Sequence, residues 1–142
     1  MRSYLTPTTL AAVALVAGCG GGDTSQPSKQ RSPKAAVVSA VKDYESAFIK
    51  GDGQGVCGRL AGDGKVKIIT AAAPLGAKSC EGAVAKILDL NGKDDLAKVK
   101  RSRDGLSESA VTIHGKRARV RLLSGKTIGL VRSEGEWLIS RP

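Results

Sequence analysis

The chain has 142 residues, which suits one compact domain rather than two once a leader is set aside. Its net charge of +10 favours anionic polymers or lipid head groups as partners, although a solvated basic surface with no specific partner is an open alternative. Aromatic residues make up only 3% of the chain and are not interleaved with the basic ones, so nucleic acid is not expected as a partner.

Residues 1–18 have the features of an export signal. Met1 and Arg2 form a short positive region, and residues 10–17 form an apolar run too short to cross a bilayer, which needs about 20 residues. The run ends in Val-Ala-Gly-Cys at residues 16–19, which resembles the lipobox of bacterial lipoproteins. The resemblance implies that diacylglycerol is attached to Cys19 and that cleavage occurs before it. An ordinary secretory leader with a chance cysteine is the alternative.

Residues 19–33 are predicted to form a lipidated, disordered tether, because the segment after Cys19 is rich in Gly, Ser and charged residues and lacks apolar ones. The folded domain is expected over residues 34–142. The predicted location is therefore the extracytoplasmic face of the cell membrane, with the lipid on Cys19 as the anchor.

Cys57 and Cys80 remain as an even pair when Cys19 carries lipid. Outside the cytoplasm such a pair first indicates a disulfide, here closing a loop of about 23 residues. Free thiols or a catalytic cysteine are the alternatives, but His114 is the only histidine that could assist one. Zinc would need more ligands, so neither a metal nor a cofactor is expected.

The first half of the domain is predicted to be helical. Ser32 and Pro33 are typical of a helix start, and an apolar stripe follows up to Gly51. Asp43 and Glu45 flank this stripe and are predicted to face solvent. A short helix is expected over residues 53–61, residues 65–73 are ambiguous, and Ser79 is predicted to cap a helix ending near residue 88 or 90.

The second half changes to alternating patterns separated by turn dipeptides. Strands are predicted over residues 99–103, 109–114, 117–123, 127–132 and 136–141. Helices followed by a strand meander indicate an α+β fold, in which helices cover one face of an antiparallel sheet and the other face contacts solvent.

Two stretches resemble the nuclear transport factor 2-like (SnoaL-like) superfamily. Residues 40–52 (AVKDYESAFIKGD) are similar to its opening helix, and residues 129–139 (GLVRSEGEWLI) to its last hairpin. The resemblance implies a curved, cone-like sheet and spans residues 34–141. Some members are isomerases, cyclases or dehydratases and others are binding or assembly domains, and dimerisation through the sheet is common, which makes a homodimer an expectation.

Three aromatic residues, Tyr44, Phe48 and Trp137, are candidates for lining a pocket in such a cone. The alternative for each is an ordinary core position. His114 falls at a predicted turn, where a base would be exposed, and no catalytic residue is assigned.

Arg117, Arg119 and Arg121 alternate along one strand and are a candidate anion-binding row, which Arg132 and Arg141 on neighbouring strands are expected to extend. A merely solvated sheet face is the alternative. The predicted function is a membrane-anchored, non-catalytic binding or assembly domain of the cell envelope. The alternative is a small-molecule enzyme of the isomerase or dehydratase type.

Overall fold

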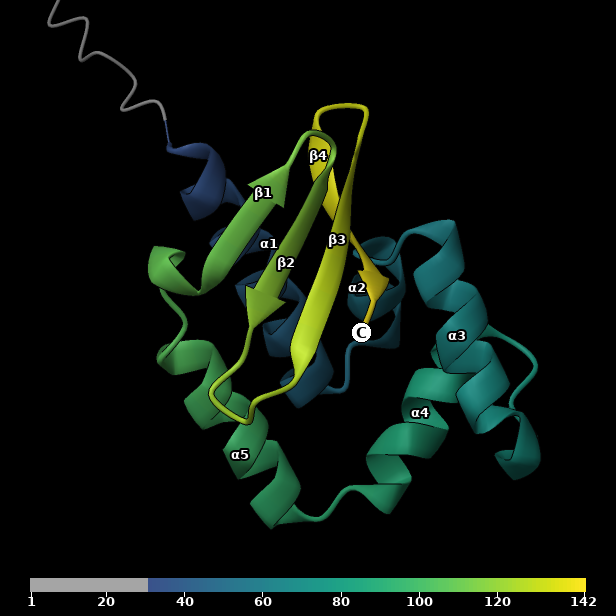
Figure 1. Cartoon of the computed structure of the whole chain (residues 1–142). Helices are drawn as coiled ribbons and strands as arrows, with labels where there is room; N and C mark the ends of the chain where they lie inside the picture. The colour runs from purple at the N-terminus through teal and green to yellow at the C-terminus, as the bar shows by residue number, and fades with distance from the viewer. Residues whose placement is uncertain (1–30) are drawn as a thin grey trace, which may run out of the picture.

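The computed structural model describes residues 31–142, so the predicted leader, Cys19 and most of the tether lie outside the described residues. Within that part of the chain the fold is α+β, with helices packed against a four-stranded antiparallel sheet (Figure 1). The α-helices are α1 (Pro33–Lys50), α2 (Gly53–Gly58), α3 (Gly62–Ala72), α4 (Cys80–Leu90) and α5 (Lys93–Asp104). The strands are β1 (Val111–His114), β2 (Arg117–Arg121), β3 (Thr127–Ser133) and β4 (Glu136–Arg141).

Helix α1 begins and ends as its sequence predicts. The Ser32 hydroxyl accepts a hydrogen bond from the backbone N–H of Ala35 at 3.0 Å, and Pro33 occupies the first turn. Gly51 ends the helix in the left-handed conformation, with φ of 72°. The Ser32 hydroxyl also donates to the Glu108 carboxylate at 2.6 Å, which ties the start of α1 to the segment before β1.

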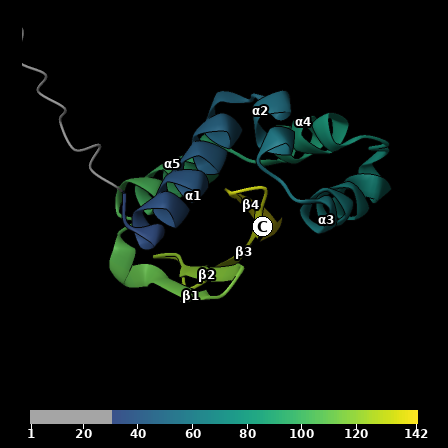
Figure 2. The ribbon, with the colours of Figure 1, turned by 90° about the horizontal axis from the view of Figure 1, so that it is seen from above.

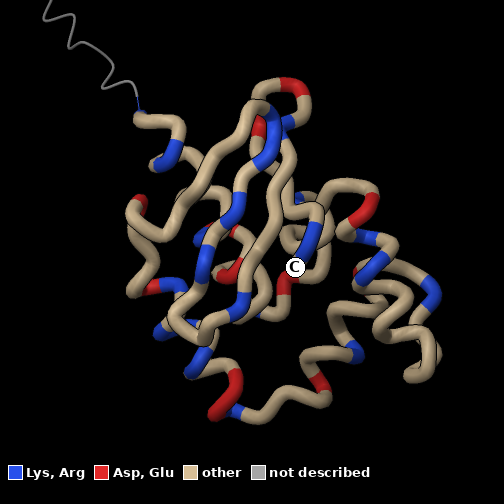
Figure 3. Tube along the Cα trace, in the orientation of Figure 1, with Lys and Arg blue, Asp and Glu red and all other residues tan. Residues whose placement is uncertain are grey.

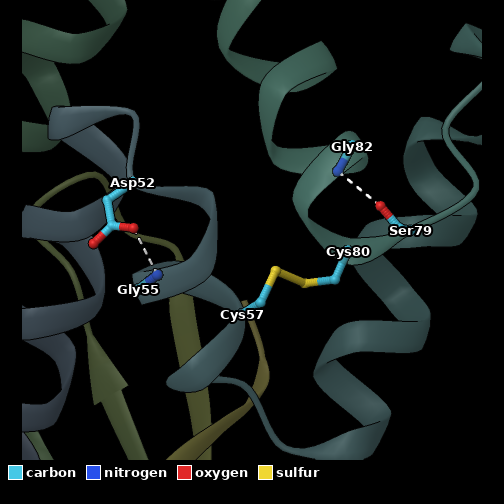
Figure 4. Close-up of a disulfide and its surroundings, with 6 residues drawn as sticks. All are labelled: Asp52, Gly55, Cys57, Ser79, Cys80 and Gly82. Carbon is cyan, nitrogen blue, oxygen red and sulfur yellow. Dashed lines mark hydrogen bonds between the residues drawn. A yellow bond between two sulfur atoms is a disulfide. The ribbon is translucent and has the colours of Figure 1, made fainter.

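The predicted disulfide is present and joins α2 to the first residue of α4. The Cα atoms of Cys57 and Cys80 lie 6.0 Å apart, and both residues are buried. Both helices have a capping side chain close to the bridge (Figure 4). At α2, the Asp52 carboxylate accepts from the N–H of Gly55 at 2.8 Å. Ser79 accepts from the N–H of Gly82 at 3.1 Å, as predicted.

The segment between α2 and α3 lies against the edge of β4. Helix α2 is shorter than predicted, because the chain leaves the helix to pair with this strand. The backbone N–H of Ile139 donates to the carbonyl of Arg59, and the N–H of Ala61 donates to the carbonyl of Ile139, both at 2.8 Å. Gly64 in α3 permits this approach, since a Cβ there would stand 2.4 Å from the Ile139 carbonyl oxygen. Of the residues 65–73, which the sequence left ambiguous between helix and extended chain, 65–72 belong to helix α3.

The strand predicted over residues 99–103 is wrong, because this segment belongs to α5. Two acidic residues open the helix and basic residues close it, which complements the helix dipole. Ion pairs Lys98–Asp95 at 2.8 Å and Lys100–Asp104 at 3.0 Å have helical spacing. The side chains that turn inward recur every three residues, at Leu96, Val99 and Ser102.

The sheet is a simple meander in the order β1-β2-β3-β4, and all its pairs are antiparallel. Figure 2 shows α1 and α5 over one face of the sheet and no helix over the opposite face of β1 and β2. β1 starts later than predicted, since Glu108–Ala110 forms a 3₁₀ turn. The core lies between α1 and the covered face, where Val37, Val41, Val120, Leu130 and Ile139 are almost fully buried.

Candidate functional site

A cavity of about 760 Å³ opens between the end of α1, helix α5 and the β2–β3 turn. Its volume falls within the range of roughly 300–1,000 Å³ typical of small-molecule sites. Its wall is partly apolar and partly polar. The lining residues are Tyr44, Glu45, Phe48, Asn91, Asp95, Lys98, Val99, Ser102, Leu122, Ser124, Lys126, Thr127, Ile128, Arg141 and Pro142.

Two residues that line this cavity each have a buried polar atom without a hydrogen-bond partner among the described residues. The atoms are Oε2 of Glu45 and Oγ of Ser102, in residues only 4% and 6% exposed. Leaving such a group unpaired costs about 1–3 kcal/mol. A ligand with a hydrogen-bond donor would satisfy the Glu45 carboxyl.

The prediction that Glu45 faces solvent is wrong. Glu45 directly follows Tyr44 and lies four residues after Val41, so it borders the apolar stripe, and α5 covers this side of α1 and buries the carboxyl. Burial raises the pKa of Glu45 to about 7, and the positive charge of Arg103 on α5 opposes the rise. Asp43 does remain exposed, with its carboxylate 3.6 Å from the guanidinium of Arg59.

The predicted aromatic trio is divided by the structure. Tyr44 and Phe48 line the cavity, and burial, followed by the charge of Glu45, raises the pKa of the Tyr44 phenol to about 12. The phenol therefore stays protonated and can donate a hydrogen bond at neutral pH. Trp137 is buried in the core on β4 and does not line the cavity.

The cavity also carries positive charge. Asp95 compensates Lys98, with 2.8 Å between their charged atoms, but Lys126 and Arg141 form no ion pair with any residue in the range 31–142. The site thus combines a buried carboxyl, an aromatic and aliphatic wall and two free cations. It can hold a small molecule with an apolar body and polar ends.

The arginine row occupies the opposite face of the sheet. Arg117, Arg119 and Arg121 are all exposed, and Ala118 and Val120 between them point into the core. Figure 3 shows the basic positions following β2 along the face that no helix covers. Arg141 extends the row. Arg132 does not, because it lies opposite the buried Trp137 and so belongs to the other face of the sheet. Its Nε donates to the Gly135 carbonyl at 3.4 Å.

His114 ends β1 with an exposed side chain and lies apart from the cavity. Between residues 31 and 142, no group of three or more His, Cys, Asp and Glu side chains could hold a metal ion. No helix in the same range is long and apolar enough to cross a membrane.

The sequence pattern could have indicated the cavity only in part. Tyr44 and Phe48 follow from the helical stripe, but the contribution of α5 was hidden by its high content of charged residues. The position of Glu45 next to Tyr44 was the one sequence signal for a buried carboxyl. It could be interpreted only once α5 was known to pack against α1.

The chain matches no protein-family model, and it matches no curated protein and no solved structure at a significant level. Its function is therefore inferred from its residues and their geometry.

Proposed function

We propose that this protein is a membrane-anchored lipoprotein of the cell envelope whose domain binds a small amphiphilic molecule in the cavity beside α1. The observation that carries the binding role is that two residues lining one cavity, Glu45 and Ser102, each have a buried polar atom, Oε2 and Oγ, without a hydrogen-bond partner among residues 31–142. A long helix across an antiparallel sheet supports the finer proposal of a nuclear transport factor 2-like domain.

The wall specifies the class of ligand. An apolar body would contact Phe48, Val99 and Ile128, and a hydroxyl or amine at the inner end would donate to Glu45. An acidic group at the other end would be attracted by Lys126 and Arg141, which have no ion pair among the described residues.

Native mass spectrometry of the full-length protein, extracted gently from its own envelope, tests the binding role. We expect a bound small molecule on the wild type, and at least about tenfold weaker retention by Glu45→Leu, because one buried hydrogen bond to a carboxyl is lost. Asp43→Asn is the matched control on the same helix, and it should retain the molecule. An empty wild-type protein would contradict the proposal and favour an assembly role.

One observation favours a second candidate, an enzyme that moves a proton with Glu45. A pKa of about 7 is near the optimum for general acid–base catalysis at neutral pH. The same experiment separates the two functions. A molecule returned unchanged after prolonged incubation supports binding, whereas its Glu45-dependent conversion supports catalysis.

The anchor rests on the lipobox at residues 16–19 and is tested separately. We expect Cys19→Ala to shift the protein from the membrane fraction to the soluble fraction, because the acyl chains can no longer be attached. Ser25→Ala, in the segment after Cys19, should remain with the membrane. Cell fractionation and immunoblotting provide the measurement, and a Cys19→Ala protein that stays in the membrane would contradict lipid anchoring.

A further inference from the structure

Gly129 leaves a gap in the uncovered face of the sheet. In the register of the sheet it lies opposite Arg119 of β2 on one side and Arg141 of β4 on the other. Since neighbouring strands lie about 4.8 Å apart, the two arginines start roughly 10 Å from each other. Gly129 itself places no side chain between them, and the nearest other side chain, the Ser140 hydroxyl, lies 3.6 Å from where a Gly129 Cβ would stand, so both guanidinium groups can reach the space above Gly129.

This gap is part of a hollow of about 310 Å³ between the sheet and α3. Helix α3 supplies Lys67 and Asp63 to its wall, and Arg117 completes it from β2. The hollow therefore gathers four cationic side chains and one carboxylate. Within residues 31–142 none of these five side chains takes part in a salt bridge or a side-chain hydrogen bond, so their charges are available to a ligand.

We infer that this hollow is a phosphate-binding site, with Arg119 and Arg141 as its two clamps over Gly129. Guanidinium groups match the oxygens of a phosphate in bidentate geometry. The excess of cations favours a phosphate monoester, which carries up to two negative charges, over a carboxylate, which carries one. The site goes beyond the proposed cavity function: Arg141 lines both the hollow and the cavity, but Arg119, Gly129 and Lys67 line only the hollow.

Titration of the oxidised full-length protein with inorganic phosphate, followed by NMR at constant ionic strength in chloride, tests the site. The backbone amide of Gly129 should shift and saturate, and Arg119→Gln should weaken the affinity about tenfold, since one bidentate charged contact is removed. Arg132→Gln removes the same charge from the same sheet outside the hollow and should change the affinity less than about twofold.

Gly129→Ala separates a shaped site from a basic surface, because it leaves every charge in place. The added Cβ would lie 3.2 Å from the Cβ of Arg141 and would fill the gap. We expect the affinity to fall by at least about fivefold, and the thermal midpoint is measured alongside to show that the variant is folded, because the added contact is tight. Equal weakening by Arg119→Gln and Arg132→Gln, or no effect of either Arg119→Gln or Gly129→Ala, would overturn the site.

The same variants identify the source of the phosphate. Vesicles of phosphatidylcholine with and without phosphatidate are added to each variant in the Cys19→Ala background, so that an acyl anchor on Cys19 cannot hold the protein on the vesicles. If phosphatidate vesicles retain Arg132→Gln but not Arg119→Gln, the ligand is a lipid head group. Equal retention of the two variants, with inorganic phosphate binding still dependent on Arg119, assigns the site to a soluble phosphate compound.

Discussion

Replacing Cys57 and Cys80 together by alanine is expected to lower the free energy of unfolding by roughly 3 kcal/mol. The bridge closes a loop of 23 residues, and in the chain-entropy model a loop of this length restricts the unfolded chain by about that amount. The loss would be a large part of the total for a small domain, which is typically about 5–15 kcal/mol. Helix α2 has six residues and cannot persist without its attachments.

Urea denaturation of the oxidised wild type and the double variant measures this effect. Reduction of the wild type is the matched control, because it opens the same loop and leaves both sulfur atoms in the core. The reduced wild type and the double variant should then agree within about 1 kcal/mol. Equal stability of the oxidised wild type and the double variant would show that the bridge does not stabilise the folded domain.

Glu45→Gln is expected to stabilise the domain above neutral pH and to have little effect at pH 4. Burial raises the pKa of Glu45 from 4.5 to about 7, so the folded protein holds a proton that the unfolded chain releases between these values. The stability contributed by the protonated carboxyl is full below pH 4.5 and is lost as the pH rises toward 7. The loss amounts to roughly 3 kcal/mol, at 1.36 kcal/mol for each pH unit.

Denaturation at a series of pH values between 4 and 8 provides the measurement. The difference in unfolding free energy between Glu45→Gln and the wild type should grow by roughly 3 kcal/mol across this range. Glu136→Gln, at an exposed carboxyl that begins β4, should leave the pH dependence almost unchanged. A difference that stays constant with pH would mean that Glu45 keeps its charge in the folded protein.

Local signals predicted much of the fold. The caps at Ser32 and Ser79 and the alternation on both sides of Ala118 each depend on residues a few positions apart, and the structure contains all three. The Cys57–Cys80 bridge followed from the pair of cysteines that remains when Cys19 is assigned to the predicted lipid anchor. These features need no knowledge of distant contacts.

The candidate site could be predicted less well, because its properties arise from contacts between distant segments. Glu45 is buried by α5, and the adjacent Ser46 hydroxyl accepts a hydrogen bond at 3.3 Å from Arg103, 57 positions later. A short run of alternating residues around Val99 resembled a strand, and no local pattern showed that the segment would pack on α1 as a helix. Because residues 99–103 were predicted as a strand rather than as part of α5, the burial of Glu45 was not predicted.

The direction of α1 also determines where an anchored domain would exchange its ligand. The chain from Cys19 enters the helix at Ser32, whereas Tyr44, Glu45 and Phe48 belong to its final turns. At 1.5 Å per residue, roughly 18–24 Å of rigid helix separates the point of attachment from the cavity. In an anchored domain the cavity would therefore open at the end of α1 that lies farther from the point of attachment.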